Sequence, residues 1–120
     1  MKNLHTFDEF LNEASDMTKN TIIVGKLEFA SSDFPENMNW ENAKDACEDL
    51  GKGWRLPTID ELMDLDIKTR MELGLWQNSW WTGTESRGST AFLYGTTSNP
   101  AKKFQTFKSD TWKVRAVRQK

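Results

Sequence analysis

Apolar residues in the first half of the chain recur at helical spacing in two places. Residues 39–50 begin with Asn39, a favourable N-cap, and their apolar side chains fall on one helical face: Trp40, Ala43, Cys47 and Leu50. Thr58 and Glu61 then form a capping box, which predicts the start of a second helix. The buried stripe of that helix is expected to contain Leu62, Leu65 and Met71.

The string GWRLPTIDEL, residues 53–62, joins these two helices. Pro57 disfavours helical geometry for Leu56, so residues 54–56 are predicted to be a short extended piece. Trp54 and Leu56 are expected in the core, and Arg55 is expected to pair with an acid of the neighbouring helices. The string is therefore interpreted as framework.

The pattern changes after residue 75 to short β-rich runs separated by turn residues. SWWTGT, TAFLYG, KKFQTF and WKVRAV predict four strands, and residues 22–24 and 27–29 predict two more around Gly25. Helices followed by several short strands indicate an α+β domain with an antiparallel sheet.

Residues 1–20 are predicted to be a separate element. Thr6 and Glu9 form another capping box, at the start of a short amphipathic helix. SDMTKN, residues 15–20, is interpreted as a linker, so the main domain is expected to span residues 21–120. One domain is also what a length of 120 residues predicts.

Charge is unevenly distributed, although the net charge is only −2. Residues 32–66 hold ten acids and three bases, a balance of −7, whereas residues 101–120 hold seven bases and one acid, a balance of +6. Aromatic residues lie among those bases, a pattern found in proteins that bind single-stranded nucleic acid. In WKVRAV, however, Lys113, Arg115 and Val117 alternate with apolar residues and predict the basic outer face of a half-buried strand. Because the whole chain is slightly acidic, nucleic-acid binding is only a further alternative.

Groups for catalysis or metal binding are sparse. His5 and Cys47 are the only histidine and cysteine, which excludes an internal disulfide and leaves too few ligands for a zinc site. Cys47 has no histidine in its own domain to activate it, so a buried structural thiol is favoured. Four acids of the second helix lack the spacing of a calcium loop and are interpreted as a solvated face: Asp60, Glu61, Asp64 and Asp66. The sequence therefore predicts a protein that is not an enzyme and that has no cofactor or metal.

The order of the motifs resembles a known fold family. NWENAKDACEDLGKGWRLPTIDEL, followed by WWTGTE and a terminal VRAVR, is similar to a bacterial and phage branch of the C-type lectin-like fold, over roughly residues 38–118. Its relatives include the C-terminal domain of bacterial collagen-like adhesins. The resemblance implies an α+β, C-type-lectin-like domain, with two helices packed on short antiparallel strands and, in this chain, a short N-terminal helix before them.

The sequence departs from the calcium-dependent members of that fold. Their Glu-Pro-Asn or Gln-Pro-Asp and Trp-Asn-Asp motifs are absent, and so is a cysteine partner for Cys47 in the last strand. The resemblance therefore implies recognition of a surface protein or glycan without calcium. Its ligand face is an irregular segment before the last strands, which corresponds here to about residues 84–111.

Candidate ligand contacts are the polar and aromatic residues in and around that segment. They are Trp80, Arg87, Tyr94, Asn99, Lys103, Asp110 and Trp112. Trp80 and Trp81 are adjacent, so in a strand their side chains point to opposite faces. With Trp81 in the core, Trp80 is expected either at an exposed contact surface or buried under another layer, and both alternatives stay open.

The N-terminal segment MKNLHTFDEFLNEA resembles the head-targeting peptides of large contractile-tailed phages. Those peptides end at a Leu-x-Glu processing site, which here would be Leu11, Asn12 and Glu13, with cleavage before Ala14. The resemblance implies an alternative function as a virion structural or internal head protein, located in a virion or in the host cytoplasm. No apolar run approaches the roughly 18 residues of a membrane span, and no signal-peptide core is present.

Overall fold

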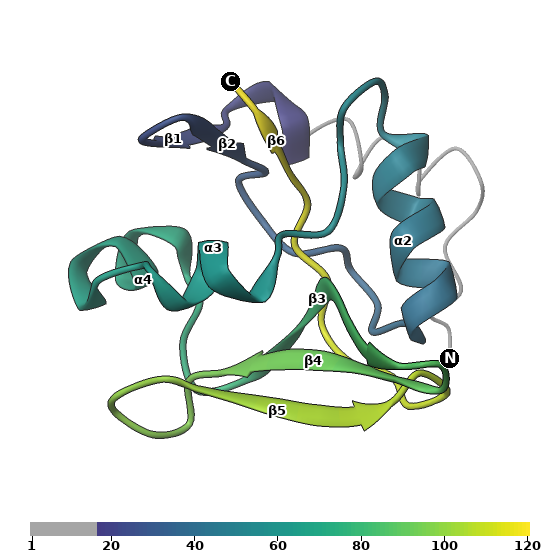
Figure 1. Ribbon diagram of the computed structural model, residues 1–120. Helices are drawn as coiled ribbons and strands as arrows, with labels where there is room; N and C mark the ends of the chain where they lie inside the picture. Colours follow the sequence, from purple (N-terminus) through teal and green to yellow (C-terminus); the bar gives the residue numbers. More distant parts are fainter. Residues whose placement is uncertain (1–16) are drawn as a thin grey trace, which may run out of the picture.

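The computed structural model describes residues 17–120, in which two antiparallel sheets and three labelled helices form one domain (Figure 1). The first sheet has the order β1-β2-β6, with β1 at Ile22–Val24, β2 at Leu27–Phe29 and β6 at Val117–Gln119. Phe29 is paired with Val117, so the last strand lies beside the first hairpin. The two strands predicted around Gly25 are confirmed.

The second sheet has the order β3-β4-β5 and contains three of the four strands predicted after residue 75. β3 spans Ser79–Arg87, β4 spans Thr90–Gly95 and β5 spans Lys102–Phe107. β5 pairs with β4 on one side only and forms an edge of the sheet (Figure 1). The predicted irregular ligand segment, residues 84–111, is therefore mostly regular strand, and its loops are short because two hairpins account for most of its length.

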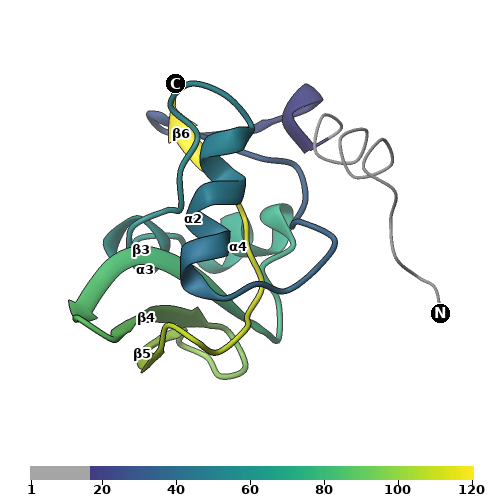
Figure 2. The same cartoon turned by 90° about the vertical axis from the view of Figure 1, so that its right-hand side faces the viewer.

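The first predicted helix is confirmed as α2, Trp40–Asp49. The side chain of Asn39 caps it by accepting a hydrogen bond from the backbone N–H of Asn42, at 2.9 Å. The helix packs its apolar face, including Ala43 and Cys47, into the core. Figure 2 shows α2 in front of the chain segment that leads into β6.

The second predicted helix is in fact two helices. The predicted capping box of Thr58 starts α3, Ile59–Met63, but a new N-cap at Asp66 then starts α4, Ile67–Leu73. The turn between them changes the helical phase, so Met71 is 60% exposed and does not belong to a buried stripe. Asp60, Asp64 and Asp66 are exposed, as the solvated-face interpretation requires.

The WKVRAV segment differs from the predicted alternating strand. Residues 112 and 113 form only isolated bridges, to Met38 and Trp80, and regular pairing begins at Val117. Arg115 and Val117 were both predicted on the outer face, yet both are buried. The reason is that this segment passes between the two halves of the core and contacts each of them, so it has no solvent-facing side at these positions.

Two hydrophobic clusters make up the core, and the adjacent residues Trp80 and Trp81 belong to different clusters. Trp81 belongs to the cluster under α2, whereas Trp80 belongs to the cluster formed with α3 and β4. The prediction that these side chains point to opposite faces is therefore confirmed. Trp54 and Leu56 are also buried, as predicted for the GWRLPTIDEL string.

The domain begins before residue 21. Met17, which the sequence placed in a linker, is buried in the first cluster, and its carbonyl oxygen accepts a hydrogen bond from the backbone N–H of Ser31 at 2.8 Å. The predicted N-terminal helix and the processing site at Leu11, Glu13 and Ala14 lie outside the described residues. Within residues 17–120, no helix has the length and apolar character needed to span a bilayer.

Met17 gives a direct test of this boundary. Because its side chain is 2% exposed, Met17→Ala is expected to lower the free energy of unfolding by about 2–5 kcal/mol. Met71→Ala makes the same chemical change at a side chain that is 60% exposed, and we expect a loss below about 0.5 kcal/mol. Urea titration measures the free energy of unfolding of both variants. Equal losses of stability in the two would show that residue 17 is outside the cooperatively folding unit.

Candidate functional site

Two of the predicted contact residues, Trp80 and Tyr94, lie inside the domain. They are directly paired across β3 and β4, and therefore point to the same face of the sheet, where α3 covers them. Both are buried, and burial raises the pKa of the Tyr94 hydroxyl. Both residues are therefore core residues and not ligand contacts. For Trp80, the buried one of the two predicted alternatives is the right one.

Trp80 is held by a partly buried polar network. Its indole N–H donates to Asp33 Oδ1 at 2.8 Å, and Arg115 Nε donates to the same oxygen at 2.9 Å. Arg115 is 4% exposed; burial lowers the pKa of its guanidinium, and the carboxylate of Asp33 opposes that change. Sequence reasoning missed this network because Asp33 and Arg115 are far apart in the chain and no local pattern joins them.

The other five predicted residues are at or near the surface but are not all together. Arg87 lies at the end of β3, and Asn99 lies in the loop between β4 and β5. The Lys103 ammonium lies 5.5 Å from the centre of the Phe92 ring, on the opposite face of β5 from Phe104. Trp112 lines a hollow, and Asp110 is hydrogen-bonded to Thr106, which lines the same hollow.

This hollow, which we name the aromatic hollow, opens on the second sheet and has a volume of about 310 Å³. Its lining combines aromatic and apolar side chains with hydroxyl and amide groups: Ser79, Leu93, Thr97, Phe104, Gln105, Thr106 and Trp112. Asp110 accepts a hydrogen bond from Thr106, one of the lining residues. The indole N–H of Trp112 has no hydrogen-bond partner in the described part of the chain.

Phe104 was missed by the sequence analysis, which chose polar and loop positions. Its side chain is 44% exposed, and its ring lies against Gly95, where an added Cβ would come within 2.6 Å of Phe104 Cε2. Gly95 therefore provides the space that the ring occupies. A glycine at the end of a β-rich run, close to an edge-strand phenylalanine, is the signal that could have found it.

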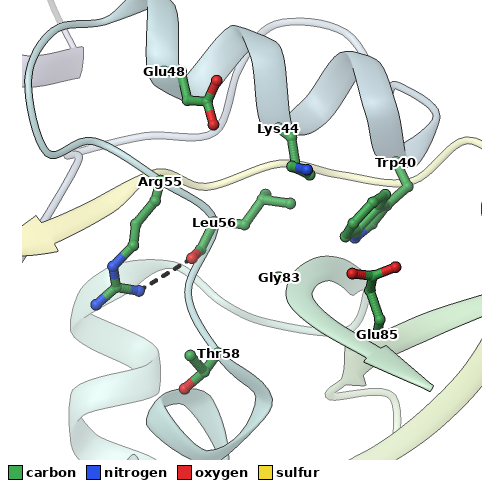
Figure 3. Close-up of a pocket in the computed structure, with 8 residues that line it drawn as sticks. All are labelled: Trp40, Lys44, Glu48, Arg55, Leu56, Thr58, Gly83 and Glu85. Atoms are coloured by element: carbon green, nitrogen blue, oxygen red, sulfur yellow. Dashed lines mark hydrogen bonds between the residues drawn. The ribbon is translucent and has the colours of Figure 1, made fainter.

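A second pocket lies between α2, the 54–58 segment and β3 (Figure 3). We name it the α2–β3 pocket; its volume is about 280 Å³. The residues that line it are Trp40, Lys44, Glu48, Arg55, Leu56, Thr58, Gly83 and Glu85. None of them was among the predicted ligand contacts.

Ion pairs stabilise two sides of the α2–β3 pocket. Arg55 Nη1 and Nη2 donate to the two carboxylate oxygens of Glu61, both at 2.8 Å, which confirms the predicted pairing of Arg55 with a nearby acid. This pairing holds the pKa of Glu61 below its usual value and shows that Glu61 is not simply a solvated acid. On the other side, Lys108 Nζ lies 2.6 Å from Glu85 Oε2 and lowers the pKa of Glu85.

The basic residues near the C-terminus do not form one basic surface. Arg115 is buried on Asp33, and Lys108 is paired with Glu85. Arg118 donates to Glu28 at 2.7 Å. Three of the seven bases that suggested nucleic-acid binding are therefore already neutralised by carboxylates, which weakens that alternative.

Two observations concern nucleophiles and metal ligands among the described residues. Cys47 is buried, as predicted, and burial raises the pKa of its thiol to about 12, so almost no thiolate exists at neutral pH. Among residues 17–120, no group of three or more His, Cys, Asp or Glu side chains is arranged to hold a metal ion.

Comparison of the sequence with protein-family models and with curated protein sequences finds no match. Among solved structures, similar folds occur in C-type lectin-like snake venom proteins. EMS16, an antagonist of collagen receptor integrin α2β1, has a TM-score of 0.65 and 14% sequence identity, over 85% of this chain and 98% of its own. Rhodocetin has a TM-score of 0.64 and 13% identity, over 85% of this chain and 96% of its own.

The fold is C-type lectin-like. The predicted α+β, C-type-lectin-like class is thus confirmed, with short helices beside antiparallel strands. At 13% and 14% identity, the likeness concerns the fold alone, and the bacterial or phage branch stays a prediction. In this C-type lectin-like domain, the aromatic hollow and the α2–β3 pocket are the two concave sites that we consider.

Proposed function

We propose that this chain is a non-catalytic recognition domain that binds a surface protein or glycan at the aromatic hollow, without calcium. The observation that carries the proposal is the hollow itself, whose lining combines the 44%-exposed Phe104 and Trp112 with hydroxyl and amide side chains. Aromatic side chains with a polar handle contribute much of the energy in recognition surfaces. The similarity to EMS16, an antagonist of an integrin, supports a binding role.

The two aromatic side chains are held before any ligand arrives. Trp112 and Met38 exchange two backbone hydrogen bonds of 3.0 Å, which fix the segment that carries the indole. Gly95 leaves the space in which the Phe104 ring lies. A preorganised surface loses less conformational entropy on binding, so more of the contact free energy at this hollow contributes to the binding affinity.

The proposed binding is tested by exposing the full chain to panels of glycans and bacterial surface proteins, in calcium and again in chelator. For any ligand found, Trp112→Ala and Phe104→Ala are each expected to weaken binding by about 30-fold, as for a contact worth about 2 kcal/mol. Trp76→Ala is the matched control because Trp76 is 50% exposed and does not line the hollow; we expect a change below about twofold.

Two results would contradict this function. Binding that disappears in chelator would indicate a calcium lectin, and binding that is equal in wild type and in both aromatic variants would place the contact elsewhere. Absence of any binding would favour the virion alternative, for which recovery of a chain beginning at Ala14 from assembled particles is the supporting observation. Thermal melting of each variant separates loss of binding from loss of fold.

A further inference from the structure

The floor of the α2–β3 pocket is formed by the apolar side chain of Leu56 and the exposed residue Gly83. Leu56 is almost fully buried and lies at the centre of the pocket, next to Gly83 (Figure 3). Gly83 does not have a left-handed backbone conformation, so its φ angle does not require glycine. An added Cβ would lie 3.5 Å from the Cβ and O atoms of Leu56, which is ordinary contact. The missing side chain at Gly83 therefore leaves space in the pocket without being demanded by the backbone.

The charged side chains around this floor alternate in sign. Glu48 and Lys44 project from α2 on one side, Glu85 lies on the β3 side below Trp40, and Arg55 lies on the remaining side (Figure 3). The order around the opening is thus negative, positive, negative and positive. A ligand with a single charge would meet attraction and repulsion here, whereas a ligand with one charge of each sign can match both.

Glu48 and Lys44 are the members of this ring available to a ligand. Neither has an ion-pair partner within residues 17–120, and the Lys44 ammonium rests 4.7 Å from the centre of the Trp40 ring. The two residues are one helical turn apart, in the order Lys then Glu, which is the less favourable order for a pair within a helix. In contrast, Arg55 and Glu85 are each partly satisfied by a partner outside the pocket.

From this arrangement we infer that the α2–β3 pocket binds a small zwitterion with an aliphatic body, of the class of a free aliphatic amino acid. Its carboxylate would contact Lys44, its ammonium would contact Glu48, and its side chain would cover Leu56. The volume of about 280 Å³ is at the lower end for small-molecule sites, which fits one amino acid better than a longer peptide. This site is independent of the function proposed at the aromatic hollow.

The ligand class is tested with three probes by amide NMR on the full chain. The probes are leucine, 3-methylbutylamine, which lacks the carboxylate, and 4-methylpentanoate, which lacks the amine. We expect leucine to shift the backbone amides of Lys44, Glu48 and Gly83 with millimolar affinity, and each singly charged analogue to bind at least about tenfold more weakly. Equal affinity for the three probes, or no shift at about 50 mM leucine, would overturn the inference.

Variants locate the contacts. Lys44→Met and Glu48→Gln are each expected to weaken leucine binding by about tenfold, and Gly83→Val is expected to abolish it by filling the floor. Lys52→Met and Glu36→Gln change exposed charges outside the pocket, and should leave the affinity within about twofold of wild type. If leucine binding is unchanged in both Lys44→Met and Glu48→Gln, which are mild surface substitutions, the inference is wrong even if Gly83→Val does not fold.

Discussion

Asp33→Ala is expected to lower the free energy of unfolding by up to about 3 kcal/mol, the lower end of the effect of breaking a buried ion pair, because the side chain of Asp33 is 21% exposed. The substitution leaves the guanidinium of Arg115, 4% exposed, without its carboxylate. It also leaves the indole N–H of Trp80 without an acceptor. Trp80 and Arg115 are themselves only 2% and 4% exposed, so water that enters the space left by Asp33 can replace only part of the lost hydrogen bonding.

Glu28→Ala is the matched control for Asp33→Ala. Glu28 also accepts a hydrogen bond from an arginine Nε, that of Arg118, at 2.7 Å, but this arginine is 38% exposed. Water can replace the lost partner there, so we expect a clearly smaller loss than for Asp33→Ala. Urea unfolding followed by tryptophan fluorescence measures both variants. Similar losses for the two would mean that burial does not determine the contribution of the Asp33 network.

Local signals in the sequence were sufficient to predict much of the scaffold. Asn39 caps α2 and Thr58 caps α3 as predicted, because a capping hydrogen bond joins residues only three positions apart. That Arg55 pairs with an acid of a neighbouring helix was also predicted; the partner is Glu61, six residues away, which the sequence had placed on a solvated face. Strands β1 to β5 follow from short β-rich runs bounded by turn residues.

Features that depend on tertiary contacts could not be predicted in this way. The alternation in WKVRAV placed Arg115 outside, but its partner Asp33 is 82 positions away and draws it into the core. The break between α3 and α4 depends on which of several acids acts as a cap, and the sequence does not distinguish Asp66 from its neighbours. Both concave sites combine residues from separate elements, so only the assembled fold shows which candidate residues share a surface.

Trp81→Ala is expected to lower the free energy of unfolding by about 3–5 kcal/mol, the range observed when a buried aromatic residue is truncated. Trp81 is fully buried in the cluster beneath α2, and no other side chain could fill the space it leaves without moving the helix or the sheet. Trp76→Ala removes the same side chain at a 50%-exposed position, so we expect a loss below about 1 kcal/mol. Denaturant titration measures the free energy of unfolding of the two variants. Equal losses of stability would contradict the conclusion that Trp81 is a core residue that cannot be replaced by its neighbours.

Trp81 also connects the core to the proposed recognition surface. Its indole N–H donates to the carbonyl oxygen of Met38 at 2.7 Å, and Met38 is the residue that exchanges two backbone hydrogen bonds with Trp112. Trp81→Phe keeps most of the buried ring but removes the donor, and is expected to cost only about 1–2 kcal/mol of stability. If Met38 positions Trp112 for binding, this variant should weaken binding at the aromatic hollow at temperatures where it is fully folded. Unchanged affinity in the folded variant would show that the 112 segment is held by its backbone hydrogen bonds alone.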